Sequence, residues 1–372
     1  MRLGIIKGGQ LGKMLIEASA GYDIFTRVMD PSHDAPCRKL CDEFVQADAS
    51  DFDAVYAFGK KSDILTFEYE HVNVEALEKL ESEGVLVYPK PRTLKIIQDK
   101  GLQKNFYVEN NIPTADFIFI DKDADIKDRI EYIPGVLKLR KHGYDGKGVF
   151  KIDTLDHSQK VVHRPSILEK MIAFEKEISV IVARNNQGES KVYPVVEMQA
   201  IPEKNILDIL FSPANISDRI KSEAENIALK IADCLDLVGV LAVEMFVMND
   251  GQILVNEIAP RPHNTGHHTI EANETSQYEQ HLRAVLGLPL GPIEAKAAAA
   301  MVNLVGADGY SGPAKFEGIE YLSEDKGYYL HVYEKKETRP FRKMGHVTVL
   351  DQDIEKAKEK ARWIKEKVRV IA

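Results

Sequence analysis

The sequence predicts a mixed fold of several domains, α/β at the amino-terminal end and α+β in the remainder. Three observations lead to this prediction. At 372 residues, the chain is too long for one ordinary hydrophobic core. Apolar strands alternate with helical segments up to about residue 88, whereas short strands with two-residue alternation dominate after residue 110. A segment with two prolines at 88–94 and a segment with Gly and Pro at 287–297 separate three units.

Composition and charge restrict the class of protein before any motif is considered. A hydrophobic content of 44% with 29% charged residues is typical of a globular chain rather than a disordered one. A formal net charge of −9 argues against nucleic acid or an acidic membrane as a partner. We expect neither a signal peptide nor a membrane span, and three cysteines are too few for a disulfide scaffold. The expectation is a cytoplasmic protein with small-molecule partners.

The first unit has a β-α-β pattern. Residues 3–6 form a short apolar strand, a glycine turn follows, and the next apolar residues recur at helical spacing. Segments 24–30 and 63–72 supply further strands, which predicts an open and mostly parallel sheet. The turn and Asp30 imitate a dinucleotide fingerprint, but Lys7 stands where its first glycine belongs. An NAD site is therefore weakly supported, although the turn suits a phosphate at a helix N-terminus.

The second and third units have the pattern of strands and helices that is typical of an α+β fold. A helix over 99–110 opens the second unit, and a long amphipathic helix over 217–235 follows its strands. The predicted strands between these helices are 135–141, 148–152, 166–172 and 177–184. The third unit is smaller, with strands and a basic helix over 353–368.

Two glutamates in one hairpin indicate a metal site. A two-residue turn at Asp250-Gly251 is favoured because both positions need positive φ, and counting outward places Glu244 directly opposite Glu257. Opposed carboxylates on one sheet face repel each other unless a divalent cation lies between them. Oxygen-only ligands suit Mg²⁺. A three-residue loop would shift this register, and the alternative is two solvated acids at strand ends.

A glycine-rich loop, GYDGKG, follows a strand that carries Lys138. Backbone N–H groups at Gly143, Gly146 and Gly148 can approach phosphate oxygens closely, and Lys138 can supply a charge to the same anion. Val149 follows where a Walker loop would require a different residue and a helix. The alternative is a plain glycine hairpin between exposed strands.

Polar and basic residues gather in two further segments. In an acidic protein, the first could bind an anionic substrate, although such runs are commonly a solvated face; it contains Lys335, Lys336, Arg339, Arg342 and Lys343. The second suits a polar substrate loop better than a metal site; it contains Arg261, His263, Asn264, His267 and His268.

In this order, GYDGKG, LEKM, the glutamates of EMF and VNE, and APRPHNTGHH resemble the ATP-grasp ligases. With GGQLGKM, FEYEHV and KKETRPFRKMGH, the chain is similar, nearly end to end, to the N5-carboxyaminoimidazole ribonucleotide synthases of purine biosynthesis. The resemblance implies a ligase that joins ATP, bicarbonate and 5-aminoimidazole ribonucleotide through carboxyphosphate, yielding N5-carboxyaminoimidazole ribonucleotide, ADP and phosphate. It also implies a Rossmann-like domain (1–98), an ATP-grasp domain with a mobile glycine-loop subdomain (99–290) and a small C-terminal domain (291–372).

The same resemblance implies roles for individual residues and a homodimer. ATP would contact Lys100, Lys138, Gly143, Tyr144, Asp145, Gly146, Lys147, Gly148, Glu169, Lys170, Met171, Ile172, Glu177, Asn256 and Glu257. Mg²⁺ would be held by Glu244 and Glu257. The ribonucleotide would contact Gly9, Gln10, Leu11, Glu68, Asn264, Lys336, Arg339 and Arg342. Catalysis would involve Lys336, Arg261, His263, Tyr144 and Lys147.

Two residues depart from the family pattern. Lys147 stands where arginine is usual, which removes a planar bidentate donor, and Lys7 stands where a small residue is usual in the glycine turn. Three alternatives remain at this point. They are another ATP-grasp ligase such as the formate-using glycinamide ribonucleotide transformylase, an NAD-dependent oxidoreductase built on the first unit, and a noncatalytic nucleotide-binding protein.

Overall fold

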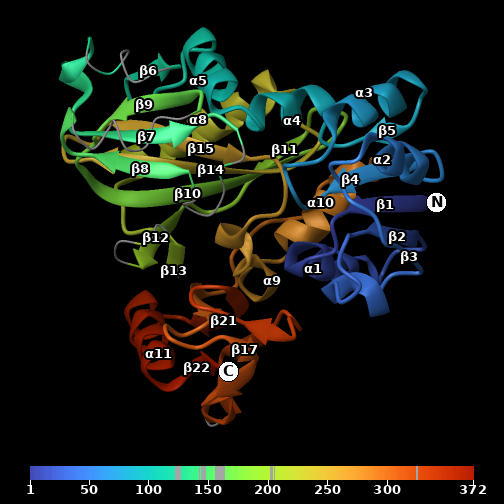
Figure 1. Cartoon of the computed structure of the whole chain (residues 1–372). Helices are drawn as coiled ribbons and strands as arrows, with labels where there is room; N and C mark the ends of the chain where they lie inside the picture. Colours follow the sequence, from blue (N-terminus) through green and yellow to red (C-terminus); the bar gives the residue numbers. More distant parts are fainter. Residues whose placement is uncertain are drawn as a thin grey trace.

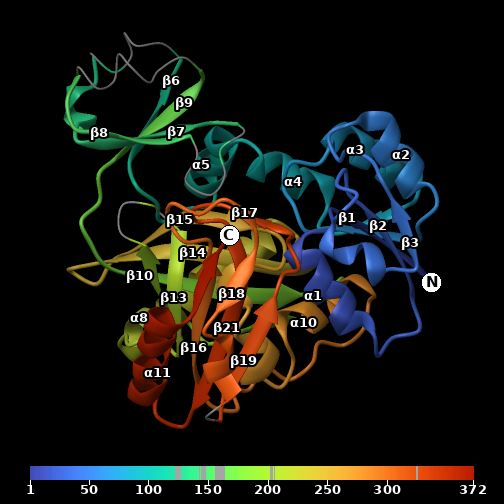
Figure 2. The ribbon, with the colours of Figure 1, turned by 60° about the horizontal axis from the view of Figure 1, so that its bottom comes forward.

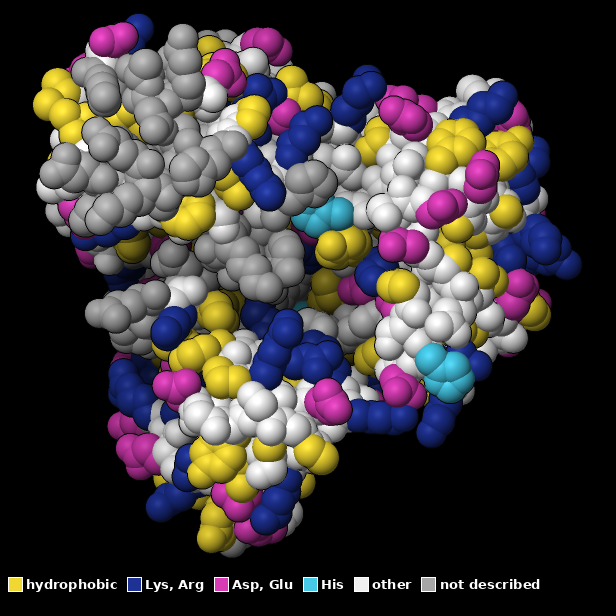
Figure 3. Space-filling view, in the orientation of Figure 1, with side chains coloured by type: hydrophobic (Ala, Val, Ile, Leu, Met, Phe, Trp, Pro, Cys, Tyr) yellow, Lys and Arg dark blue, Asp and Glu magenta, His cyan; other side chains and the backbone are white. Residues whose placement is uncertain are grey.

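The computed structural model shows three parts (Figures 1 and 2), and the space-filling view shows a hollow between them (Figure 3). It describes residues 1–121, 126, 128–141, 143, 148–155, 164–201, 204, 206–323 and 326–372. The amino-terminal part is blue in Figure 1, the central part runs from cyan to orange, and the carboxy-terminal part is red. Within the described residues, none of the helices combines the length and apolarity needed to cross a membrane.

The amino-terminal part is built on an open parallel sheet, as the sequence predicted, and this sheet has five strands. Leu3, Ile5 and Ile6 of its central strand are fully buried, because helices cover both faces of the sheet. The strand order is β3 (Glu43–Val45), β2 (Phe25–Met29), β1 (Arg2–Ile6), β4 (Ile64–Phe67) and β5 (Leu86–Val87). The covering helices are α1 (Gln10–Ser19), α2 (Phe52–Gly59) and α3 (Val74–Ser82).

A nine-stranded sheet, antiparallel throughout, runs through the central part and continues into the carboxy-terminal part. Its main path is β15 (Ile253–Ala259), β14 (Gly239–Met248), β10 (Phe174–Arg184), β12 (Val196–Ile201), β13 (Ile206–Ser212), β16 (Ala298–Val305), β21 (Lys343–Asp351) and β19 (Tyr328–Val332). The ninth strand, β11 (Ser190–Val192), pairs with β10. Strand β16 follows the linker at 287–297 and pairs with β13, Ile209 facing Val302. The expected boundary at residue 290 therefore lies between two parts of the chain that contribute strands to one sheet.

A separate four-stranded antiparallel sheet lies beside the large sheet, at the upper left of Figure 1. Its order is β6 (Phe117–Ile120), β9 (Ser166–Lys170), β7 (Gly135–Leu139) and β8 (Val149–Ile152). It has its own small core, centred on Ile120, Leu137 and Leu168. The segment from β9 to β10 leads directly into the large sheet, and Lys138 on β7 lies 3.0 Å from Asn256 on β15. The two sheets therefore face each other across a space that we call the cleft.

The helices predicted at the start of the second unit and near the carboxy terminus are confirmed. Helix α5 (Lys100–Glu109) begins after Asp99, whose carboxylate accepts hydrogen bonds from the amides of Gly101 and Leu102. The long helix α8 (Asp218–Cys234) packs its apolar face on β10 and β14. The basic helix α11 (Ile354–Lys367) covers β16 and β21 in the same way. The remaining longer helices are α4 (Pro91–Ile97) and α10 (Gln277–Val285).

Candidate active site

The hairpin that carries the two glutamates forms, but its turn is one residue longer than predicted. The predicted two-residue turn pairs Asn249 with Gln252, whereas the amide of Met248 donates to the carbonyl of Gln252 at 2.8 Å. The result is a three-residue turn that ends at Gly251, whose φ of 81° lies in the left-handed region. The predicted turn is therefore wrong, since an Asp-Gly pair suits either turn length.

A β-bulge restores the pairing of the glutamates. The register shifts between Glu244 and Met245, so that Glu244 faces Glu257 and Asn256 is the extra residue on its strand. The predicted opposition is confirmed, although it depends on the bulge and not on the turn. The Asn256 carboxamide oxygen accepts a hydrogen bond from Lys138 Nζ at 3.0 Å.

One lysine contacts the acidic pair, and two further lysines lie around Glu169 beside it. Lys100, in the first turn of α5, places Nζ 3.0 Å from Glu257 Oε2. Lys138, on β7, lies 2.9 Å from Glu169 Oε2, and Lys104 lies 3.0 Å from the other oxygen of Glu169. The structure thus brings the predicted Lys100 and Lys138 together. Glu169, expected at the adenine, is held between two lysines.

Lys104 is a charged residue of the site that the sequence analysis did not single out. It is only 2% exposed, and burial lowers its pKa to about 8. The sequence did contain a signal for Lys104. It follows Lys100 by four residues on the same helix, and residues four apart share one helix face.

The two opposed carboxyl groups have different electrostatic surroundings. Burial raises the pKa of Glu244, and the charges of Glu257 and Glu177 raise it further. Lys100 holds the pKa of Glu257 below its usual range. The one basic group within ion-pair distance of Glu244 among the described residues is His263, with Nε2 3.8 Å from Oε1. Two facing carboxylates with this excess of negative charge provide the oxygen donors that fit Mg²⁺.

The residues expected around adenine and ribose lie where the small sheet joins the large one. Lys170 ends β9, Met171 and Ile172 connect it to β10, and Glu177 lies on β10. Lys170 forms an ion pair of 3.0 Å with Asp116. Burial raises the pKa of Glu177. These residues therefore border the cleft that also contains the lysines and the acidic pair.

The glycine loop connects β7 and β8. Lys138 pairs with Val149 at the end of this hairpin, and Gly148 has a left-handed φ of 77°. Gly143 is described as well. The other predicted loop residues, Tyr144, Asp145, Gly146 and Lys147, lie outside the described residues.

A second group of predicted residues lies between the amino-terminal and central parts. The amide of Gly9 donates to Glu68 Oε1 at 2.8 Å, and Arg261 forms an ion pair of 2.6 Å with Glu70. Asn264 is 7% exposed, and no described residue hydrogen bonds to either atom of its carboxamide. Burial raises the pKa of Glu68 to about 7. Polar groups that are buried without partners are suited to meet a ligand.

Gln10 and Leu11, the two remaining residues predicted near the glycine turn, differ in how far their side chains are exposed. Gln10 is the first residue of α1 and is half-buried. Leu11 is 8% exposed and packs in the core of the amino-terminal part. Its side chain therefore faces away from solvent.

The basic segment between β19 and β21 reaches across to the amino-terminal part. Lys336 Nζ lies 2.5 Å from Asp34 Oδ1. Arg342 donates to the carbonyl of Glu337 at 2.6 Å, and burial together with Arg339 lowers its pKa. Arg339 is exposed and has no ion pair with any described residue. Figure 3 shows Lys and Arg side chains gathered at the rim of the central hollow.

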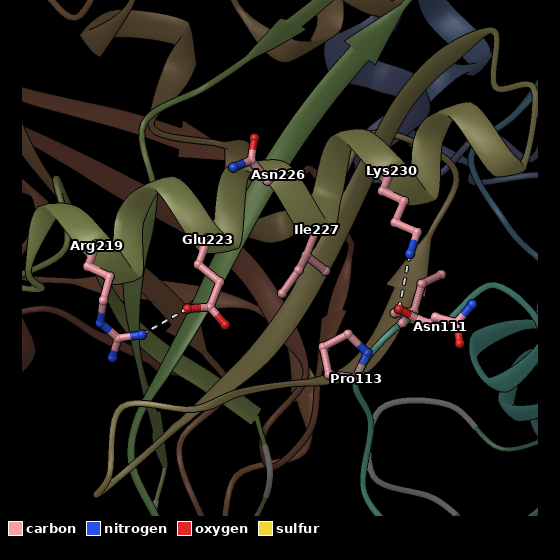
Figure 4. A pocket seen from close by; sticks show the side chains of 8 residues that line it. Asn111, Pro113, Arg219, Glu223, Asn226, Ile227 and Lys230 are labelled. Carbon is pink, nitrogen blue, oxygen red and sulfur yellow. Dashed lines mark hydrogen bonds and ion pairs between the residues drawn. The ribbon is translucent and has the colours of Figure 1, made fainter.

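A groove on the outer face of α8 is separate from this site (Figure 4). It has a volume of about 360 Å³, and none of the predicted site residues lines it. Its charged side chains are already paired, Arg219 with Glu223 at 3.0 Å and Lys230 with the carbonyl of Asn111 at 3.1 Å.

The fold and the site define an ATP-grasp enzyme: an antiparallel glycine-loop sheet and a large sheet enclose a cleft with opposed glutamates and converging lysines. Three known families match the chain in order. They are a ribonucleotide synthetase preATP-grasp domain over residues 1–98, an ATP-grasp domain over 105–278, and a phosphoribosylaminoimidazole carboxylase C-terminal domain over 299–360. The chain belongs to the N5-carboxyaminoimidazole ribonucleotide synthase family, which confirms the resemblance seen in the sequence.

Relatives with this name cover almost the whole chain. The synthase of Brucella melitensis is 38% identical, over 93% of this chain and 95% of its own. The synthase of Bacillus subtilis is also 38% identical, over 94% of this chain and 91% of its own. The crystal structure from Thermotoga maritima superposes with a TM-score of 0.93 at 42% identity, covering 100% and 99%. A structure from Aspergillus clavatus, in complex with ADP and 5-aminoimidazole ribonucleotide, has a TM-score of 0.90 at 31% identity, covering 98% and 97%.

The raised pKa of Glu68 generates a prediction about stability. The pKa of a Glu in an unfolded chain is near 4.5, whereas burial raises the pKa of Glu68 to about 7. The folded protein therefore loses stability as pH rises through this interval. Glu68→Gln keeps an oxygen for the Gly9 amide and removes the charge. We expect the ligand-free variant to be more stable than the wild type at pH 8 by about 1–3 kcal/mol.

Urea unfolding at several pH values measures this difference in the free energy of unfolding. It should shrink as pH falls from 8 to 5, because the wild-type carboxyl becomes protonated. Glu359→Gln, on the exposed face of α11, is the matched control. A Glu68→Gln variant that is less stable than the wild type at pH 8 contradicts the prediction.

Proposed function

We propose that this cleft carries out the ATP-dependent carboxylation of 5-aminoimidazole ribonucleotide with bicarbonate, giving N5-carboxyaminoimidazole ribonucleotide, ADP and phosphate in purine biosynthesis. The observation that carries the proposal is the meeting of Lys100, Lys138 and the pair Glu244 and Glu257 at one cleft in a chain of this family. ADP and the ribonucleotide are present in the Aspergillus clavatus structure named above. Their transfer to this chain is part of the proposal.

The chemistry requires a reactive form of bicarbonate. An oxygen of bicarbonate attacks the γ-phosphorus of ATP, the bond to the bridging oxygen breaks, and ADP leaves with the electron pair. The carboxyphosphate then has a carbon that the exocyclic amine of the ribonucleotide attacks, directly or after release of CO₂. Phosphate departs with its electron pair, and the amine loses a proton. Positioning and charge neutralisation dominate catalysis of phosphoryl transfer.

In this proposal, the lysines neutralise the triphosphate. Lys100 and Lys138 contact phosphate oxygens, and their present partners, Glu257 and Glu169, hold them in position before ATP binds. The glycine loop after β7 covers the phosphates, and the segment 169–172 with Glu177 contacts the adenosine. Pre-placed cations need little reorganisation when charge moves from the γ-phosphate to the leaving oxygen.

Mg²⁺ completes the ATP site in the proposal. Glu244 and Glu257 would hold it, with Asn256 beside them, and it would supply charge neutralisation for the phosphates. The fit rests on oxygen donors that face each other and on the raised pKa of Glu244, which marks a place where positive charge is favoured. The expected homodimer and cytoplasmic location stay predictions.

The ribonucleotide is proposed to lie between the amino-terminal part and the basic segment. Arg339 and Arg342 would bind the phosphate dianion, because concentrated positive charge is needed in a chain of net charge −9. The reacting end would meet Lys336, Arg261 and His263. Gly9, Gln10, Leu11, Glu68 and Asn264 would form the remaining contacts.

ADP release tests the proposed reaction directly. The wild type should hydrolyse ATP slowly alone and much faster when 5-aminoimidazole ribonucleotide and bicarbonate are both present. Each co-substrate omitted in turn is the control. An equal rate with glycinamide ribonucleotide and formate would assign the chain to the formate-using ligases, and turnover of NADH would contradict both assignments.

Glu257→Gln tests the acidic pair. The substitution keeps the shape but removes one full charge from the proposed metal site, so ADP release should fall by at least about 100-fold. The thermal midpoint of the ligand-free protein should change little. Glu359→Gln should retain full activity. Near-normal turnover of Glu257→Gln at ordinary Mg²⁺ concentrations would rule out the proposed role.

Arg339→Ala tests the phosphate contact. We expect the Michaelis constant for the ribonucleotide to rise at least about tenfold, equivalent to about 1.4 kcal/mol, with that for ATP nearly unchanged. Arg362→Ala, on the exposed face of α11, is the matched control. An equal rise for both substrates would place Arg339 at the ATP phosphates, and no change for either would make it a solvated surface residue.

A further inference from the structure

Lys7 adopts a backbone conformation that ordinarily favours glycine. Its φ is 76°, in the left-handed region, where a side chain other than glycine is disfavoured by contact with the backbone. Lys7 follows the last residue of β1 and opens the turn Lys7-Gly8-Gly9 that leads into α1. A strained residue beside a candidate site suggests that its side chain has a use there.

The side chain extends along the edge of the amino-terminal sheet where the strands end. Its Nζ lies 3.4 Å from Asp30 Oδ2, at the end of β2, and 5.4 Å from the ring centroid of Tyr69, just after β4. The side chain is 24% exposed. The ammonium group therefore lies at the carboxyl ends of three adjacent strands and is accessible from outside.

This edge is where an open parallel sheet receives a ligand. The strand order β3-β2-β1-β4-β5 reverses direction between β1 and β4, because the chain first builds outward from β1 to one side and then to the other. Ligands bind in the crevice outside the carboxyl ends of the strands at such a switch point. The contact of Gly9 with Glu68, at 2.8 Å, lies in this crevice.

The crevice has an excess of acid. Asp30 and Glu68 are both buried, and Glu70 is adjacent in the sequence to Tyr69. Lys7 and Arg261 are the basic groups whose charges lower the pKa of Glu68, against the larger effect of its burial. Arg261 is already paired with Glu70 at 2.6 Å. An anionic ligand that entered this crevice without Lys7 would meet mostly like charge.

Asp30 does not depend on Lys7 as a partner. Its carboxylate accepts hydrogen bonds from the amides of Gly8 at 2.9 Å and Ser32 at 2.8 Å. The 3.4 Å separation from the ammonium of Lys7 is longer than a charge-assisted hydrogen bond, which measures about 2.7–2.9 Å. The ammonium is thus held loosely enough to turn toward a ligand.

We propose that Lys7 is a binding residue for the ribonucleotide substrate, whose anionic ribose-phosphate part its ammonium contacts at the crevice between β1 and β4. This assignment rests on the proposed function and adds to it a cation outside the basic segment of the carboxy-terminal part. It also gives the lysine side chain a use at a position whose backbone favours glycine. The contact would contribute to binding of the ribonucleotide and leave binding of ATP unaffected.

The test compares Lys7→Gly and Lys7→Arg with the wild type. Lys7→Gly removes the charge and relieves the backbone, so the ligand-free variant should unfold at the same temperature as the wild type or higher. Its Michaelis constant for 5-aminoimidazole ribonucleotide should rise about five- to tenfold, with that for ATP within about twofold. The Michaelis constants of Lys7→Arg for both substrates should stay within about threefold of the wild-type values. Lys39→Ala, an exposed lysine of the same domain, is the matched control for net charge and should change neither constant.

Ionic strength supplies a second readout. The difference between the wild type and Lys7→Gly should shrink as KCl is raised from 50 to 500 mM, because salt screens the proposed contact. The proposal is overturned if the Michaelis constant for the ribonucleotide is unchanged in Lys7→Gly, whether or not the variant loses stability. It is also overturned if the Michaelis constant for ATP rises equally. A wild type whose ADP release is indifferent to the ribonucleotide would instead refute the proposed function.

Discussion

Glu244 and Glu257 face each other across two paired strands, and the rest of the site is arranged around the repulsion between them. Like charges at cross-strand distance are unfavourable, and more so where protein excludes water. Lys100 offsets the charge of Glu257 at 3.0 Å, whereas Glu244 has only His263 within ion-pair range among the described residues. Burial raises the pKa of Glu244, and the charges of Glu257 and Glu177 raise it further. A binding partner that brings positive charge relieves the repulsion between the two carboxylates, as the proposed Mg²⁺ would.

The site is assembled by the sheets more than by the ion pairs that connect the three parts. Ion pairs of this kind include Lys336 with Asp34, Lys13 with Glu334 and Arg261 with Glu70. Lys336 and Asp34 are both exposed, as is Glu334, and ion pairs of exposed side chains contribute little to stability. By contrast, the continuous sheet from β15 to β19 fixes the acidic pair and the strands that flank the basic segment in one body. The carboxy-terminal part thus presents Arg339 and Arg342 from a rigid base.

The sequence predicted the elements whose signals are local. The parallel amino-terminal sheet, α5, α8 and α11 follow from periodicity and capping residues, and the facing of Glu244 and Glu257 was also correct. The turn length was wrong, because the bulge at Asn256 that compensates for it leaves no trace in a hydrophobic pattern. Lys104 was missed, since its role depends on burial against Glu169, a partner 65 positions away whose contact only the folded cleft creates. The pairing of β16 with β13 is likewise a long-range contact that no local pattern specifies.

The basic groups of the site are for the most part held by acids before any substrate is present. Lys100 is paired with Glu257, Lys138 with Glu169, and Arg261 with Glu70. These pairs fix each cation in place, so a bound anion gains from charge that is already oriented. The acids also weaken anion binding, because an anion must compete with them for the cations. Only an anion that contacts several cations at once gains enough binding free energy to do so. A triphosphate, which would meet Lys100 and Lys138 together, satisfies this condition, whereas a single small anion does not. Selectivity for the triphosphate therefore follows from the same pairing that orders the lysines.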